Sequence, residues 1–242
     1  MYKVFLSLIL CLSFVLHVME SQAASTLEVL EGLRNANPDI VEKTCKSLGL
    51  DRGASGLSKV QVFFPCCAKA DNSLAVFSIS WEGPTNGYII LMDPKGDVID
   101  KKRVGYIKNI SLNPLRPESS DDLIIDAIKG TGTGMRDDLF YIFSISNQGF
   151  KELWSELSYE KSFPLAMAKG KNYEIKGTVV FEDIDGDDIK EIIYSTRRTK
   201  YHFNVRSQKL LPSKSERKVM VYKLTEGKYF IFKKYLDGSP LP

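Results

Sequence analysis

A short acidic segment after residue 180 carries the side chains whose spacing most clearly predicts chemistry. Its carboxylates stand at relative positions 1, 3, 5 and 9, and alternate side chains of a tight loop can turn toward one centre. Gly186 lets the backbone bend inside the segment. A Ca²⁺ site takes roughly six to eight oxygen donors, and a backbone carbonyl at position 7 would add one to the carboxylates. The predicted ligands are Asp183, Asp185, Asp187, Ile189 and Glu191.

The spacing is not that of an EF-hand, because that loop needs Gly and Glu where this chain has Asp188 and Tyr194. It resembles instead the calcium loop of FG-GAP and VCBS repeats, the integrin-type propeller motif D-x-D-G-D-x-x-x-D/E followed by an apolar strand. Gly186 and the apolar pair Ile192-Ile193 also match, whereas Asp188 replaces the usual second glycine and the FG and GAP signatures are missing. The resemblance implies a propeller-like module with one structural Ca²⁺. An acidic turn without metal is the alternative.

A basic segment follows the acidic one almost directly. Residues 197–234 contain twelve Lys or Arg against two Glu, so the formal net charge of +3 for the whole chain hides a polarised molecule. Aromatic and leucine side chains interleave with these charges. We expect the connection 196–217 to bind an anionic envelope component or an acidic protein surface, and we expect no nucleic acid partner. The alternative is a solvated connection without a partner. The residues predicted to bind are Arg197, Arg198, Lys200 and Arg206.

Histidine is too scarce to support most acid–base mechanisms. The chain has two His, and His17 lies in the expected signal peptide, which leaves His202. That residue stands among Lys and Arg, with no acidic neighbour to orient it. The sequence therefore favours a non-catalytic protein. A calcium-stabilised hydrolase acting on a glycan or phosphoester is the alternative, with Asp183 or Asp187 paired with Glu182.

The first residues are typical of a secretory signal peptide. Lys3 precedes an apolar run of fifteen residues, which is short for a membrane helix, and Ser21 and Ala23 supply small residues before a cleavage point. We expect residues 1–23 to be removed, the mature protein to be periplasmic or secreted, and no membrane span to remain after cleavage.

Three cysteines remain in the mature chain, in a compartment that permits disulfides. Because three is odd, at most one bridge can form within the chain. The prediction is a Cys45–Cys66 disulfide, which closes a loop of about 20 residues. Cys67 as the partner of Cys45, a vicinal Cys66–Cys67 bridge, and buried thiols are the alternatives. No zinc site is expected, because the cysteines form no CxxC pair and no His is near them.

Two short helices are expected ahead of the β region. Ser25 opens a capping box before leucines at helical spacing. Asn37 and Pro38 then supply the N-cap and first position of a second helix, which Gly49 ends. We assign residues 24–58 to this N-terminal helical pair.

From residue 59 to 242 the pattern changes to short runs of β-branched and aromatic residues separated by turn signals. Three stretches, at about 70–104, 120–158 and 176–236, each predict strand, connection, strand, tight turn and strand. A repeat near 50 residues built from short strands is typical of propeller blades. Since three units are too few for a closed propeller, we expect a mainly β fold of antiparallel, propeller-blade-like units in a partial propeller or curled sandwich. Unrelated hairpins of an all-β chain would give the same overlay.

The composition is that of a folded globular protein. The chain has 242 residues, 43% of them hydrophobic and 26% charged, which leaves room for one or two domains. The expected function is that of an exported, non-catalytic β-repeat protein that binds or scaffolds at the envelope and carries one structural calcium loop. A further alternative is an inhibitor or partner-recognition protein that uses the basic segment, and a long exposed basic hairpin would favour it.

Overall fold

The computed structural model describes most of the chain after residue 30. The predicted signal peptide and most of the first predicted helix lie outside the described residues. Within the described part, no helix is both long and apolar enough to cross a membrane. The described residues are 31–32, 35, 37–50, 57–63, 65, 74–81, 86–93, 97–117, 121–163, 172–204, 206–236 and 239–240.

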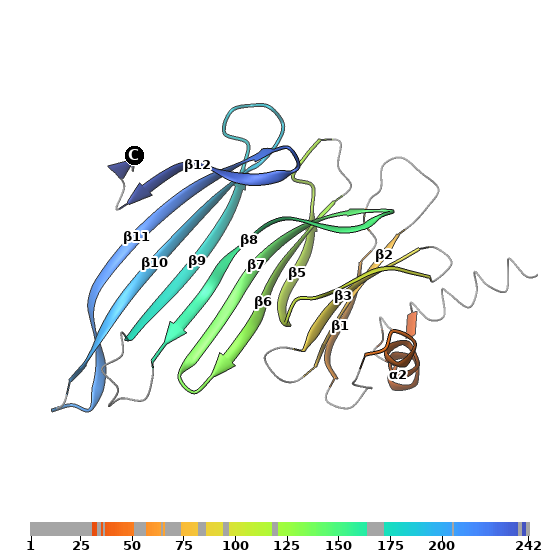
Figure 1. Ribbon diagram of the computed structural model, residues 1–242, viewed down its shortest axis with the longest axis horizontal. Helices are drawn as coiled ribbons and strands as arrows, with labels where there is room; N and C mark the ends of the chain where they lie inside the picture. The colour runs from red at the N-terminus through yellow and green to blue at the C-terminus, as the bar shows by residue number, and fades with distance from the viewer. Residues whose placement is uncertain are drawn as a thin grey trace, which may run out of the picture.

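The described elements form two antiparallel sheets, one of four strands and one of nine, so the expectation of a mainly β, antiparallel fold is confirmed (Figure 1). Within each sheet every strand pairs with the next along the chain. The elements are α2 (Pro38–Ser47), β1 (Leu57–Phe63), β2 (Ala75–Trp81), β3 (Gly87–Met92), β4 (Val98–Arg103), β5 (Tyr106–Asn113), β6 (Asp122–Gly132), β7 (Met135–Ser146), β8 (Gly149–Ser162), β9 (Asn172–Glu182), β10 (Glu191–Asn204), β11 (Lys209–Thr225), β12 (Lys228–Leu236) and β13 (Ser239–Pro240).

Helix α2 begins and ends where the sequence predicts. The side chain of Asn37 accepts hydrogen bonds from the N–H groups of Asp39 and Ile40, at 3.1 and 3.4 Å, and Pro38 occupies the first helical turn. At the other end, Gly49 adopts a φ of 61°, which a glycine reaches without steric cost. The second helix of the predicted pair is therefore confirmed.

The four-stranded sheet is the middle of three layers. Helix α2 packs on one of its faces through a cluster that includes Val41, Phe77 and Trp81. The nine-stranded sheet packs on the other face through a cluster that joins Val76 and Ile89 to side chains of β5 to β8. Because β2 is covered on both faces, all seven of its residues are buried. Figure 1 shows α2 beside this small sheet, with the large sheet fanning away from it.

The nine-stranded sheet unites two of the predicted repeat units. Strand β8 of the unit at 120–158 continues to β9 of the unit at 176–236 through pairs that begin with Tyr159 opposite Lys176. Propeller blades would each form a separate sheet, so the propeller-blade-like arrangement is not confirmed. The overlay of the units arises because each contains a hairpin, and a hairpin has the same sequence pattern in a blade as in a longer meander.

The predicted connection 196–217 is wrong as a connection, because almost all of it is paired strand. Thr196 lies opposite Lys218 and Asn204 lies opposite Lys209, so β10 and β11 form one long hairpin. The strands contain 14 and 17 residues. The many Lys and Arg residues of this segment interrupt the alternation of apolar and polar residues that is typical of a strand. Such residues are uncommon in strands, but solvent-exposed strands tolerate them.

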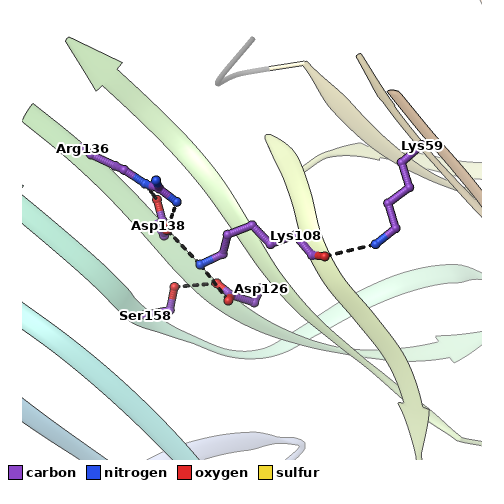
Figure 2. A network of polar contacts seen from close by, with 6 residues as sticks. All are labelled: Lys59, Lys108, Asp126, Arg136, Asp138 and Ser158. Carbon is purple, nitrogen blue, oxygen red and sulfur yellow. Dashed lines mark hydrogen bonds and ion pairs between the residues drawn. The ribbon is translucent and has the colours of Figure 1, made fainter. Parts of the chain in front are cut away.

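A partly buried network of charged groups lies on the large sheet, and one hydrogen bond connects it to the small sheet (Figure 2). The ammonium of Lys108, on β5, contacts the carboxylates of Asp126 and Asp138 at 2.7 and 2.8 Å. Arg136 donates two hydrogen bonds of 2.8 Å to Asp138, whose side chain is only 1% exposed. Lys59 of β1 donates to the backbone carbonyl of Lys108 at 3.0 Å, which extends the network to the small sheet. Two cations thus balance two carboxylates, and the arrangement is a structural one.

Replacing Lys108 with Met should destabilise the protein by about 3 kcal/mol, because Asp126 and Asp138 would face each other without the cation between them. The matched control is Lys59→Met, which removes one hydrogen bond to a carbonyl and should cost only about 1 kcal/mol. Urea denaturation measures both values. Equal losses in the two variants would show that the ion pairs of Lys108 contribute nothing beyond a single hydrogen bond.

Candidate functional site: an acidic loop and a basic hairpin

Strand β10 connects the two candidate sites, which lie at its opposite ends. The acidic loop spans residues 183–190 between β9 and β10, and the basic hairpin is formed by the far halves of β10 and β11. In Figure 1 the loop between β9 and β10 lies at the top, and the end of the β10–β11 hairpin lies at the lower left. A strand of 14 residues is about 45 Å long, so the two sites act as separate surfaces.

The loop brings together three of the predicted ligands. One carboxylate oxygen each from Asp183, Asp185 and Asp187 lies within 4.8 Å of the other two, and all three residues are exposed. Such a cluster of hard oxygen donors could hold a metal ion. The predicted convergence of alternate side chains on one point is confirmed for these residues.

Side-chain hydrogen bonds to the backbone give the loop its shape. Asp183 accepts from the N–H groups of Gly186 and Asp188, at 2.7 and 3.0 Å. Asp187 accepts from the N–H of Ile189 at 2.9 Å. This last hydrogen bond is the main cause that lowers the pKa of Asp187, and nearby Lys223 adds to it. The Ile189 carbonyl, the predicted fifth ligand, remains a prediction. The carboxylates therefore fold the loop as well as supplying its charge.

Glu191 has a different place from the three aspartates. Its side chain is 2% exposed, and one oxygen accepts a hydrogen bond from the N–H of Ile184 at 2.8 Å. The other oxygen is buried and has no hydrogen-bond partner among the described residues. Glu191 is not a member of the exposed three-aspartate cluster. It holds the loop from the inner side and keeps one oxygen available for a further contact.

A lysine from β11 lies at the acidic cluster. The ammonium of Lys223 contacts the carboxylates of Asp185 and Asp187, the latter at 3.2 Å. The hydrogen bond to Asp185 is the main cause that raises the pKa of Lys223, so its charge persists at any physiological pH. Sequence reasoning missed this residue, because Lys223 lies 38 positions after Asp185 and only strand pairing brings it near.

A small pocket adjoins the loop. Its volume is about 100 Å³, which is well below the roughly 300 Å³ of the smallest usual small-molecule sites. Its wall is mostly apolar, although the charged residues Asp185, Glu191, Lys223 and Lys233 also line it. The lining residues are Ile184, Asp185, Glu191, Val221, Lys223, Phe232, Lys233 and Tyr235.

Cations of the same sign face each other across the basic hairpin. Arg197 lies directly opposite Arg217, and Lys200 lies directly opposite Lys214. On β9, Lys176 lies opposite Arg197, so three cations stand side by side on three consecutive strands. Neighbouring strands are about 4.8 Å apart, and like charges in directly opposed positions are destabilising. Sequence reasoning missed Lys176 because it precedes the acidic loop.

The four residues predicted to bind an anion have two different environments. Arg197, Lys200 and Arg206 are exposed. Arg198 is half-buried, and its guanidinium lies 4.6 Å from the centre of the Tyr173 ring. The structure therefore presents the first three to solvent, and Arg198 contributes mainly to packing on β9.

The predicted disulfide remains a prediction, because Cys66 lies outside the described residues. Cys45 lies on the buried face of α2 and is a free cysteine. Burial raises the pKa of its thiol to about 11, so the thiol is uncharged and unreactive near neutral pH.

Two residues of the acidic loop have positive φ, and substitutions there should have opposite effects. Gly186 has a φ of 76° with open space around it, whereas Asp188, at the position of the usual second glycine, has a φ of 63°. Replacing Asp188 with Gly should relieve backbone strain and stabilise the protein by about 0.5 kcal/mol, while Gly186→Ala should destabilise it by about 1 kcal/mol. Thermal unfolding measures both. A lower melting temperature for Asp188→Gly would mean that the Asp188 side chain itself stabilises the loop.

The chain matches no protein-family model, and no curated protein or solved structure is significantly similar to it. The resemblance to FG-GAP and VCBS repeats rests on the residues of the acidic loop.

Proposed function

We propose that this protein is an exported, non-catalytic binding protein that contacts an anionic component of the cell envelope through the β10–β11 hairpin. The signal-peptide pattern of residues 1–23 supports export. The observation that carries the proposal is the opposition of like charges across the hairpin, at Arg197 with Arg217 and at Lys200 with Lys214. This is the long basic hairpin that favours partner recognition over an inert connection.

Electrostatics explains why the hairpin suits an anion. Directly opposed cations repel each other, so the free hairpin carries an unfavourable interaction that a bound anion would remove. Part of this repulsion is already compensated, because Glu216 pairs with Lys214 at 2.7 Å, Glu174 pairs with Lys176 at 3.3 Å, and Arg217 donates to the Ser195 hydroxyl at 3.2 Å. A partner with several negative charges would contact the row of cations at once, and the attraction would weaken as salt increases.

The acidic loop, in the same proposal, holds a structural Ca²⁺. The three clustered aspartates supply hard oxygen donors, whereas Glu191 lies outside the cluster and holds the loop by accepting from the N–H of Ile184. Lys223 places a single positive charge at the cluster, where a divalent ion would neutralise more of the negative charge. When bound, the ion would stiffen the connection between β9 and β10, as the resemblance to the FG-GAP and VCBS loops implies.

Two observations support binding over hydrolysis at this loop. The adjoining pocket of about 100 Å³ is too small to enclose a sugar ring and its neighbours. A carboxylic acid that protonates a leaving group needs a raised pKa, whereas the pKa of Asp187 is lowered, mainly by the N–H of Ile189. The carboxylate-based hydrolase is thus the weaker alternative.

Calcium should stabilise the protein through the clustered carboxylates. With free Ca²⁺ at about 100 times its Kd, the melting temperature should rise by about 5 °C over that in excess chelator. The double variant Asp185→Asn with Asp187→Asn should lose this rise. The matched control, Glu182→Gln with Asp188→Asn, removes two charges from the same segment outside the cluster and should keep it. If chelation leaves the melting temperature of the parent protein unchanged, the calcium part of the proposal is wrong.

Neutralising the opposed arginines should weaken binding to a soluble polyanion. Titration calorimetry with heparin should show roughly tenfold lower affinity for Arg197→Gln with Arg217→Gln, because two adjacent charges are lost from one row. The control, Lys43→Gln with Lys129→Gln, removes two exposed charges elsewhere and should bind like the parent. Equal affinity in the two double variants would contradict a specific role for the hairpin.

A further inference from the structure

We infer that the anionic partner is a lipid bilayer, and that one face of the distal β10–β11 hairpin lies flat on its surface. This inference rests on the proposed function, because it uses the same cations. It adds an apolar element that a purely electrostatic contact would not need. The argument starts from which side chains share that face.

Strand alternation places a defined set of side chains on this face. Strand β10 pairs with β9 without a register shift, so Arg197, Tyr201 and Phe203 point to the same side. Directly opposed residues of an antiparallel pair also share a side, which adds the β11 partners Leu210 and Pro212. We call this set the hairpin face. Its members are Asn172, Glu174, Lys176, Arg197, Thr199, Tyr201, Phe203, Leu210, Pro212, Ser215 and Arg217. The carboxylate of Glu174 pairs with Lys176 at 3.3 Å and accepts a hydrogen bond from the Tyr201 hydroxyl at 3.2 Å.

The outer part of the hairpin face is apolar. Phe203 lies opposite Leu210, and Tyr201 lies opposite Pro212. Although it is a large aromatic side chain, Phe203 is 37% exposed. The ring of Phe163 packs edge-on against Tyr201, with 5.2 Å between the ring centres, and so extends the patch toward β8. Phe203 and Pro212 are exposed, and Phe163, Tyr201 and Leu210 are half-buried, so this part of the face offers a small, partly exposed apolar surface.

Cations border this patch at both ends along the strands. The row of Lys176, Arg197 and Arg217 lies on its inner side, and six residues separate Arg197 from Phe203, or about 20 Å. On its outer side, Arg206 is exposed at the hairpin turn, whereas Lys209 lies opposite Asn204 and points to the other face of the hairpin. A flat apolar strip with positive charge on both sides matches a bilayer surface, where anionic headgroups surround accessible acyl chains.

The apolar pair favours a bilayer over an acidic polysaccharide. Neither Phe203 nor Leu210 has a side-chain hydrogen-bonding group, so neither can form hydrogen bonds with the hydroxyls of a sugar chain. Both side chains would leave water when they enter the boundary between headgroups and acyl chains, which is favourable. Half-buried Tyr201 adds an aromatic ring, while its hydroxyl donates a hydrogen bond to Glu174 at 3.2 Å.

Vesicle binding tests the inference with the protein purified after export. The parent protein should sediment with vesicles of equal parts phosphatidylglycerol and phosphatidylcholine. It should stay in the supernatant when the vesicles contain phosphatidylcholine alone. Phe203→Ser should weaken vesicle binding roughly tenfold and leave heparin affinity unchanged, because it removes apolar contact and no charge. The matched control is Phe230→Ser on β12, since Phe230 is 55% exposed and lies outside the hairpin face. It should bind vesicles like the parent.

The outcomes separate this inference from the proposed function. Heparin binding without vesicle binding would overturn the bilayer and leave a polysaccharide-type partner, so the proposed function would stand. Vesicle binding that Phe203→Ser does not weaken, or that Phe230→Ser weakens equally, would overturn the docking of the hairpin face. A protein that binds neither probe would overturn both proposals.

Discussion

The pairing of β10 with both of its neighbours is the constraint on which the two candidate sites depend. Eleven of its residues pair with β9, from Glu191 opposite Glu182 to Tyr201 opposite Asn172. On the other side β11 follows it to the final pair of Asn204 with Lys209. The first residue of β10 closes the acidic loop, and the last ones form the basic hairpin. Because the strand is paired on both sides, a shift of its register against β9 would displace both sites.

The two sites treat charge in opposite ways. At the loop, Lys223 of β11 forms ion pairs with Asp185 and Asp187. Backbone N–H groups donate hydrogen bonds to Asp183 and Asp187. At the hairpin, strand pairing places arginine against arginine, although the rest of the fold shows how cations can be compensated. Lys108 lies between two carboxylates and Arg136 binds one of them with two hydrogen bonds. The hairpin thus sets like charges side by side, although Lys214 also pairs with Glu216 and Arg217 donates to the Ser195 hydroxyl.

Features that depend on nearby residues were predictable from the sequence, and features that depend on register were not. The capping of α2 by Asn37 and the convergence of the loop aspartates follow from residues within a few positions of one another. Other contacts could be predicted only if the strand order and the residue pairs were known. They are the contact of Lys223 with the acidic loop, the row from Lys176 to Arg217, and the network around Lys108. A single extra residue, Ser213, shifts the register of β11 beside Tyr201, and no local pattern indicates such a bulge. The repeat overlay also compared local patterns only, and the propeller-blade-like arrangement that it predicted is not confirmed.

The central claim is that the opposed arginines of the hairpin are an unfavourable pair that a bound anion relieves. Thermal unfolding at low salt, with and without inorganic polyphosphate, tests this directly in the parent protein and in Arg197→Gln with Arg217→Gln. Without polyphosphate, the variant should have a higher melting temperature than the parent. Polyphosphate should raise the melting temperature of the parent until the two proteins melt at the same temperature. A variant that melts lower than the parent, or an equal rise in both proteins, would contradict it.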